Sequence, residues 1–304
     1  MNVLVTGGAG FIGSHLVDLL VKDQTEHIVV YDNFYRGREA NIAQHLGNPA
    51  VQLEKGDLRD YDRLLGVMRH SDVVYHLGAQ SNVIGAVRDT DYSFQTNVFG
   101  TYNVLKGARE TGVKKVVFTS SREVYGEARY LPVDEAHPIG SKNTYGASKV
   151  AGEMYCQVFQ NLFDVQTVIL RLSNVYGPRD FGRVIPIWLE RAHRHQNLEI
   201  YGGEQVIDFV WIEQVVEALI RATTLGRVEQ AINVGSGQGT QILDLARRIL
   251  ALIDTPSQID LKPVRSAEVV RFTADVTRMK DILGLTPSAD PLDGLSRMID
   301  LPAS

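Results

Sequence analysis

The sequence predicts an α/β protein built on a doubly wound parallel sheet. Three observations carry this prediction. A glycine-rich turn joins the first apolar segment to a helical pattern, apolar segments alternate with helical ones as far as residue 172, and the apolar segments are nearly continuous. Continuous apolar strands are typical of a sheet covered by helices on both faces. Ligands of such sheets bind beyond the carboxyl ends of the strands, so we expect the functional residues there.

The elements follow one another in a regular order through the first part of the chain. Strands are expected near residues 3–5, 28–31, 51–53, 72–77, 116–118 and 167–172. Helical patterns are expected to run to residue 21, to about residue 69, from 92 to 110 and from 145 to 162. A polar stretch that ends at residue 45 and a long loop with Pro132 and Pro138 connect these elements.

Three glycines after the first strand have the spacing of a dinucleotide-binding turn. Gly7 makes the tight turn, Gly10 lets the backbone approach a pyrophosphate, and Gly13 lets the helix pack on the strand. The helix N-terminus then offers unpaired N–H groups and the positive end of its dipole to the anion. This unit predicts a Rossmann fold that binds a dinucleotide.

The second strand ends in Asp32, 19 residues after Gly13. This is close to the spacing expected for a carboxylate that binds the ribose hydroxyls. Because Asp32 would repel a 2′-phosphate, the sequence favours NAD over NADP, although the nearby Arg36 and Arg38 weaken that preference.

The regular alternation weakens after Asn174. A helix is expected over 187–195, a strand over 206–212 followed by a helix to 224, and a strand over 231–234. We expect 1–173 and 206–235 to form an NAD-binding domain, and 174–205 and 236–304 to form a smaller, discontinuous C-terminal α/β lobe that binds the substrate.

Three residues have the types needed to move a proton at a sugar hydroxyl. Tyr145 and Lys149 are four residues apart, so one helix face presents both. A nearby ammonium, together with the positive charge of a nicotinamide, favours the phenolate and lowers the pKa of Tyr145. Tyr145 could then accept the hydroxyl proton while hydride leaves the same carbon, and Ser121 could hold that hydroxyl in line.

Together these motifs resemble the extended short-chain dehydrogenase/reductases, in the nucleotide-sugar epimerase/dehydratase group. The matching segments are 6–13, 56–58, 76–80, 120–126, 145–149 and 171–178, with Asn97, and the likeness covers essentially the whole chain. Asp32-Asn33 is similar to the ribose contact of UDP-galactose 4-epimerases. The resemblance implies NAD, a nucleoside diphosphate-sugar substrate, and a homodimer. In that dimer the helices near 92–110 and 145–162 would pair into a four-helix bundle.

Cofactor contacts are expected at the glycine turn, at the strand ends and at the Tyr–Lys pair. The residues are Gly7, Gly10, Phe11, Ile12, Gly13, Asp32, Asn33, Asp57, Leu58, Leu77, Ala79, Gln80, Asn97, Thr119, Tyr145 and Lys149. Asp57 is expected to contact the adenine amine, but it could equally cap the following helix.

Substrate contacts are expected at Ser121, Arg122, Asn174, Arg183 and Arg265. The resemblance implies that Asn174 and Arg265 contact the substrate phosphates, while a surface arginine is the other interpretation of Arg265. The family usually has Arg where this chain has Ile207, so Arg183 is a candidate replacement for that phosphate contact.

The segment 121–123 bears on the reaction. Typical 4,6-dehydratases of the group carry an Asp-Glu pair here, and Arg122 replaces the Asp. Glu123 remains, as in nucleotide-sugar decarboxylases, unless it simply pairs with a neighbouring Arg or Lys. The sequence therefore favours a nucleotide-sugar 4-epimerase of the UDP-glucose/UDP-galactose type, with catalytic residues Ser121, Tyr145, Lys149 and Glu123. The alternative is a dehydratase or uronate decarboxylase that uses Glu123, and a non-catalytic dinucleotide sensor is less favoured.

The composition narrows the class of protein. The chain has 304 residues, a net charge of −5 and 44% hydrophobic residues, which support a full core but give no basic footprint for nucleic acid. A single cysteine, Cys156, excludes an internal disulfide and a multi-cysteine metal site. No apolar run reaches membrane-spanning length, and a strand that starts at residue 2 leaves no room for a signal peptide. We therefore expect a soluble cytoplasmic protein with no metal.

Overall fold

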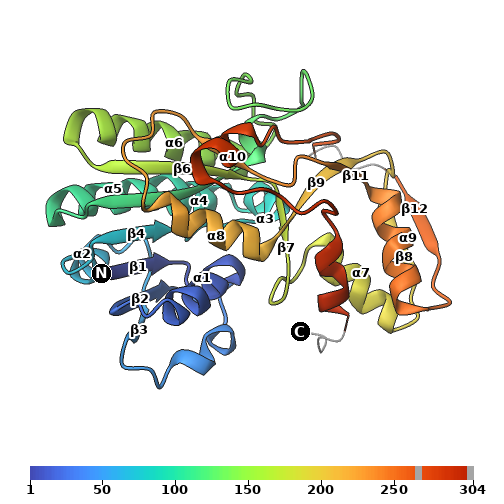
Figure 1. Cartoon of the computed structure of the whole chain (residues 1–304), viewed down its shortest axis with the longest axis horizontal. Coiled ribbons are helices and arrows are strands. Elements are labelled where there is room, and N and C mark those ends of the chain that lie inside the picture. The colour runs from blue at the N-terminus through green and yellow to red at the C-terminus, as the bar shows by residue number, and fades with distance from the viewer. Residues whose placement is uncertain (264–268, 300–304) are drawn as a thin grey trace.

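The computed structural model describes residues 1–263 and 269–299. Within them, a seven-stranded parallel sheet has the order β10-β6-β5-β4-β1-β2-β3. Its strands are β1 (Asn2–Thr6), β2 (His27–Asp32), β3 (Val51–Lys55), β4 (Val73–His76), β5 (Lys115–Ser121), β6 (Gln166–Leu172) and β10 (Ile232–Val234). Helices cover both faces (Figure 1), so the predicted doubly wound parallel sheet is confirmed.

The two faces of the sheet are packed by different helices. These are α1 (Phe11–Lys22) and α8 (Ile212–Ala222) on one face, and α2 (Tyr61–Met68), α5 (Gly100–Thr111) and α6 (Thr144–Phe163) on the other. Alternate residues of β1 enter opposite cores: Val3 and Val5 pack with α1 and α8, whereas Leu4 packs with the other three helices. Cys156 is buried in this second core. Each face of the sheet must therefore be apolar, which explains the continuous apolar strands in the sequence.

The helix predicted over 92–110 is interrupted. The segment consists of α4 (Thr90–Phe94), a π-helical turn (Gln95–Phe99) and α5, after a short α3 (Val83–Arg88). Asn97 in the π-helical turn is buried, and its side chain accepts from the N–H of Gln80 at 2.8 Å and donates to Ser148 Oγ at 2.9 Å. A π-helical turn adds a residue to the helix, and here it aims Asn97 inward at these partners.

A smaller part extends from one side of the large sheet (Figure 1). A three-stranded sheet combines β7 (Asn174–Tyr176), β9 (Val206–Trp211) and β11 (Gly239–Gln241), and β8 (Leu198–Tyr201) pairs with β12 (Ile259–Lys262). Helices α7 (Val184–His193) and α9 (Ile242–Ile253) close a third core around Trp188 and Phe209. A short α10 (Thr277–Leu283) and a helical turn (Asp293–Met298) complete the described chain.

The strand predicted over 206–212 exists, but it joins the smaller sheet between β7 and β11. The chain then returns to the large sheet through α8 and β10, and α8 packs against α1. The domain boundaries drawn from the sequence stay a prediction. In the described part of the chain, every helix is too short or too polar to serve as a membrane span.

Candidate active site

A cleft of about 610 Å³ runs along the carboxyl ends of the parallel strands and continues into the smaller part. Its walls include the glycine turn, Asp32, the loop after β4, the end of β5, the first turns of α6 and the start of β7. The topology therefore brings together the strand ends at which the sequence predicts functional residues.

The glycine turn leaves no space for side chains. Gly7 has φ = +70°, and a Cβ atom on Gly13 would lie 2.2 Å from the Gly7 carbonyl oxygen and 2.7 Å from the Gly8 Cα. The α1 helix begins after Gly10 without a side-chain cap, so the N–H groups of its first turn are free to bind an anion in the cleft. This backbone fits the pyrophosphate of a dinucleotide.

Asp32 lies beside this turn with its carboxylate already oriented. The carboxylate accepts hydrogen bonds from the N–H groups of Ala9 at 3.1 Å and Phe34 at 2.8 Å. Burial raises the pKa of Asp32, and these two donors lower it. Arg36 and Arg38, which weakened the preference for NAD, both lie over the ring of Phe181 instead.

Asp57 does not cap the following helix, so that interpretation is wrong. The cap of α2 is Asp60, whose carboxylate accepts from the Arg63 N–H at 3.2 Å. Asp57 instead accepts from Arg59 at 2.8 and 2.9 Å and from the Asn33 amide at 2.9 Å. The Arg59 hydrogen bonds lower the pKa of Asp57 to about 2.

Most of the predicted cofactor contacts line the cleft. Those that do are Gly7, Gly10, Phe11, Ile12, Gly13, Asp32, Asn33, Leu58, Leu77, Ala79, Thr119, Tyr145 and Lys149. Gln80 and Asn97 are buried behind the wall and bond to each other. They shape the loop after β4 and do not reach the cleft surface, and Asp57 also lies outside the lining.

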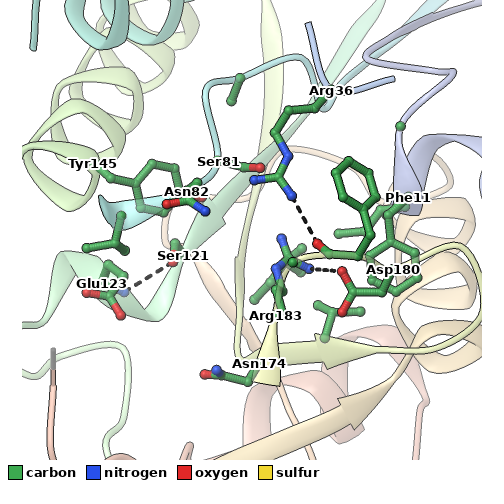
Figure 2. Close-up of a pocket in the computed structure, with 18 of the residues that line it drawn as sticks. Phe11, Arg36, Ser81, Asn82, Ser121, Glu123, Tyr145, Asn174, Asp180 and Arg183 are labelled. Atoms are coloured by element: carbon green, nitrogen blue, oxygen red, sulfur yellow. Dashed lines mark hydrogen bonds and ion pairs between the residues drawn. The ribbon is translucent and has the colours of Figure 1, made fainter. Parts of the chain in front are cut away.

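The three proton-transfer candidates meet in the middle of the cleft. Asn143 caps α6 by accepting from the Gly146 N–H at 2.8 Å, and this places Tyr145 opposite Ser121 at the end of β5 (Figure 2). Lys149 is buried and donates from Nζ to the Thr119 carbonyl at 2.8 Å.

Burial controls the proton affinity of this pair. It raises the pKa of the Tyr145 phenol to about 12, while the charge of Arg183 and a hydrogen bond with Ser121 lower it. Burial also lowers the pKa of Lys149 to about 8. The effect of Lys149 on the pKa of Tyr145 stays a prediction. The sequence analysis names Arg183 only as a phosphate contact and does not predict its effect on the phenol.

Glu123 is held on both sides. The Arg122 guanidinium lies 3.1 Å from Glu123 Oε1, and the Asn143 amide donates to Oε2 at 2.7 Å. Arg122 also donates from Nε to Asn174 Oδ1 at 2.5 Å. The carboxylate is buried, so these two partners replace the water that it would otherwise bind.

The smaller part supplies the remaining predicted substrate contacts. Asn174, Arg183 and Ile207 line the cleft, and Arg183 lies 3.3 Å from Asp180 Oδ1. Burial raises the pKa of Asp180 to about 6. Arg265 lies outside the described residues.

Several residues that line the cleft were not predicted. They are Tyr35, Ser81, Asn82, Asp180, Phe181, Trp188 and Tyr201. They come from loops and from the smaller part, and none of them belongs to a motif that the sequence analysis uses. The acidic Asp180, three residues before Arg183, was the one local hint of an ion pair.

A family model described as "NAD dependent epimerase/dehydratase family" matches residues 3–235. The chain belongs to this family. The resemblance drawn from its motifs is thereby confirmed, and NAD is its cofactor, which agrees with the glycine turn and with Asp32.

Relatives in this family share the whole length of the chain. A UDP-glucose 4-epimerase of Mycolicibacterium smegmatis is 34% identical over 308 residues, which cover 99% of this chain and 98% of the relative. The structure of a UDP-glucose 4-epimerase with UDP-glucose from Thermotoga maritima has a TM-score of 0.93 at 32% identity and covers 99% and 98% of the two chains. A dTDP-glucose 4,6-dehydratase from Streptomyces venezuelae with NAD bound has a TM-score of 0.94 at 28% identity, with 98% and 96% coverage. The family is enzymatic, and its members catalyse more than one reaction on this fold.

Proposed function

We propose that the chain is a nucleotide-sugar 4-epimerase of the UDP-glucose/UDP-galactose type. The observation that carries this proposal is the state of Glu123, whose two oxygens are held by Arg122 and Asn143. The groups needed for reversible oxidation at C4, namely Ser121, Tyr145 and Lys149, lie together in the cleft. The likeness to UDP-glucose 4-epimerases supports the same reaction.

Three side chains have different roles at the C4 oxygen of the sugar. Tyr145 accepts the hydroxyl proton, Ser121 holds the oxygen in line, and Lys149 stabilises the phenolate. NAD supplies a reversible hydride acceptor when bound. The 4-keto sugar then turns within the cleft, and Tyr145 returns the proton to the same oxygen. Asn174 and Arg183 hold the diphosphate while the sugar turns.

Elimination would require a further base. A carbonyl at C4 makes the neighbouring C5–H bond acidic, and a free carboxylate within reach could take that proton while water leaves C6. Glu123 is the carboxylate that the motif offers for this step, and its ion pair with Arg122 and its hydrogen bond from Asn143 oppose that role. This argument favours the epimerase over the dehydratase, and the likeness to UDP-glucose 4-epimerases favours it over the decarboxylase. A non-catalytic sensor would have no need for the assembled Tyr145–Lys149 pair.

The test is incubation with a panel of UDP-, GDP-, dTDP- and CDP-hexoses and hexuronates, with products read by mass and by proton NMR. An unchanged mass with inverted configuration at C4 is the expected result. Loss of water or of carbon dioxide would favour the alternative reaction. Reduction of the bound cofactor is measured by its near-ultraviolet absorbance. If no sugar causes this reduction, the sensor is favoured.

Releasing Glu123 should open the elimination route. In Arg122→Leu we expect a dehydrated product to rise by about 10²-fold over the unsubstituted protein, the lower end of what a placed base contributes. The double variant Arg122→Leu/Glu123→Gln is the matched control, and its dehydrated product should fall back to the starting level. A single variant that yields only epimer would show that Glu123 is not restrained by Arg122.

We also propose a homodimer formed by α5 and α6, which lie side by side (Figure 1). The end of α4, the π-helical turn and α6 expose large apolar side chains. They are Phe94 on α4, Phe99 on the turn, and Met154, Tyr155, Val158 and Leu162 on α6. Contiguous exposed apolar surface of this kind marks an interaction site. A second copy of the same face would cover it in a four-helix bundle.

A charge in this face should separate the subunits. Leu162 is 70% exposed, and Leu162→Glu is expected to shift the mass measured by light scattering from dimer to monomer. Leu261, which is 59% exposed on β12, provides the control, because Leu261→Glu lies outside the proposed interface. A monomeric unsubstituted protein would contradict the proposal.

A further inference from the structure

Two loops from distant parts of the chain meet at the cleft. Phe181 in loop 178–183 lies under two arginines of loop 33–38, with its ring centroid 4.7 Å from the Arg36 guanidinium carbon and 4.3 Å from that of Arg38. Arg36 also donates from Nη2 to the Phe181 carbonyl at 3.1 Å (Figure 2). We call Arg36, Arg38 and Phe181 the clasp.

The first loop is part of the cofactor-binding turn. The Arg38 N–H donates to the Ala9 carbonyl at 3.0 Å, and the Asn41 amide donates to the same oxygen at 2.9 Å. Gly37 lies against Asp32, because a Cβ atom on Gly37 would be 2.7 Å from both carboxylate oxygens. The clasp is therefore fixed to the residues predicted to bind the pyrophosphate and the ribose.

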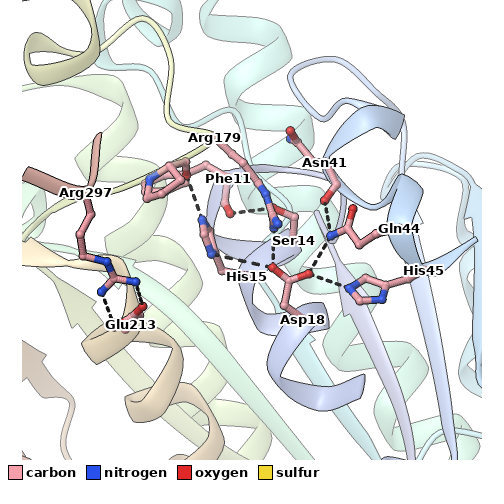
Figure 3. Close-up of polar contacts among 11 residues, drawn as sticks. Phe11, Ser14, His15, Asp18, Asn41, Gln44, His45, Arg179, Glu213 and Arg297 are labelled. Carbon is pink, nitrogen blue, oxygen red and sulfur yellow. Dashed lines mark hydrogen bonds and ion pairs between the residues drawn. The ribbon is translucent and has the colours of Figure 1, made fainter. Parts of the chain in front are cut away.

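Loop 178–183 has a second contact with the cofactor-binding part at its first two residues. Asp18 on α1 lies 2.7 Å from the Arg179 guanidinium, and His15 donates from Nε2 to the Pro178 carbonyl at 2.9 Å (Figure 3). Burial lowers the pKa of His15, and this hydrogen bond needs only a neutral ring. The loop is thus held to the cofactor-binding part at 178–179 and again at Phe181.

The loop contributes two residues to the wall of the cleft, Asp180 between the two anchors and Arg183 after the second. The Arg183 guanidinium carbon lies 5.7 Å from the ring centroid of Phe11, in the first turn of α1. Loop 178–183 therefore runs along the cleft from Phe181, beside the predicted ribose site, to Arg183, whose charge lowers the pKa of Tyr145.

We propose that the clasp closes the cofactor end of the cleft and makes NAD exchange slow. Both loops line the cleft beside the residues predicted to bind the pyrophosphate and the ribose, so parting the stacked ring and the carbonyl hydrogen bond would open this end of the cleft. The proposed epimerase needs this property, because the hydride taken from a sugar must return to that sugar. The clasp itself rests on NAD as the cofactor and stands whether the reaction is epimerisation or elimination.

The alternative role for Arg36 and Arg38 is to bind the 2′-phosphate of NADP. Both guanidinium groups are stacked on Phe181, and Arg36 is also committed to a carbonyl. A phosphate-binding role would require them to leave these partners. The two roles predict different behaviour when Phe181 alone is changed.

The experiment follows replacement of bound NAD by isotopically labelled NAD in the purified holoprotein, without any sugar present. Phe181→Ala should exchange about tenfold to a hundredfold faster, since it loses both stacked cations and loosens the loop. Arg36→Ala should act in the same direction, and Phe181→Tyr should restore slow exchange. Phe163→Ala is the matched control, because Phe163 lies under Arg109 at 4.0 Å but does not line the cleft.

The proposal would be overturned if Phe181→Ala exchanged its bound NAD at the same rate as the unsubstituted protein. It would also be overturned if the purified protein never held NAD. A shift toward NADP or away from it in Arg36→Ala, with no effect of Phe181→Ala, would assign the arginines to phosphate. Because exchange is measured without sugar, a failed epimerase assay leaves this result intact. Melting curves of each variant show whether the fold has been kept.

Discussion

Replacing Tyr145 by phenylalanine should lower turnover by about 10²–10⁴-fold, the contribution expected of a placed acid–base group. The phenol lies opposite Ser121 in the cleft, and without its hydroxyl the C4 proton has no acceptor there (Figure 2). The ring remains, and so do the glycine turn and Asp32, so NAD should stay bound. The expected variant is therefore an inactive protein that still carries its cofactor.

The measurement is kcat for sugar inversion by NMR, with bound NAD quantified in the same sample. Tyr35→Phe removes a hydroxyl from another tyrosine that lines the cleft, and it should keep near-normal turnover. Turnover above half of normal in Tyr145→Phe would rule out the phenol as the proton acceptor. Loss of NAD from that variant would instead indicate a binding role.

The central sheet follows from local properties of the sequence. Val3, Leu4 and Val5 are all buried because successive residues enter opposite cores, and such a strand has to be apolar throughout. Gly13 is required by contact with the backbone of Gly7, which is itself a near neighbour in sequence. Constraints between residues that are close in sequence produce patterns of apolar residues and glycines from which the fold can be predicted.

Features that depend on distant partners could not be predicted. The π-helical turn at Asn97 depends on Gln80 and Ser148, and the apolar periodicity around it still resembles one helix. The strand β9 has a clear pattern, but only tertiary pairing decides which sheet it joins. Local propensity identifies elements better than it places them.

The candidate site divides in the same way. Asp32, Ser121 and Tyr145 follow strand ends or open a helix, so their position is set by elements that the sequence reveals. The partner of Arg36 is Phe181, 145 residues away, and nothing near either residue indicates the contact. Contacts between residues that are far apart in the sequence, such as Arg36 and Phe181, can be identified only from the three-dimensional structure.

Breaking the buried ion pair behind the site should lower the stability of the fold strongly. Arg171 on β6 donates to Glu153 on α6 through Nε at 2.9 Å and Nη2 at 2.7 Å, and the side chains are 6% and 2% exposed. Arg171→Met leaves Glu153 buried without its cation, which should lower the free energy of unfolding by about 3–5 kcal/mol. Midpoints of urea unfolding with an unchanged slope would measure this.

Two comparisons separate the buried charge from the lost contacts. The double variant Arg171→Met/Glu153→Leu removes both charges and should recover most of the stability, since apolar replacement of a buried pair is often neutral. Arg247→Met breaks an exposed pair with Asp244 and should change stability by no more than about 1 kcal/mol. A loss of under 1 kcal/mol in Arg171→Met would mean that Glu153 finds another partner or water.

The same pair also bears on catalysis through its neighbours. Ser120, next to Ser121 on β5, donates to Glu153, and Glu153 lies one helical turn after Lys149. The pair therefore joins the strand that carries Ser121 to the helix that carries Tyr145 and Lys149. We expect the double variant to regain stability without regaining full turnover, because leucine packs in the core but cannot hold the Ser120 hydroxyl. Full recovery of both properties would show that packing alone sets the distance between Ser121 and Tyr145.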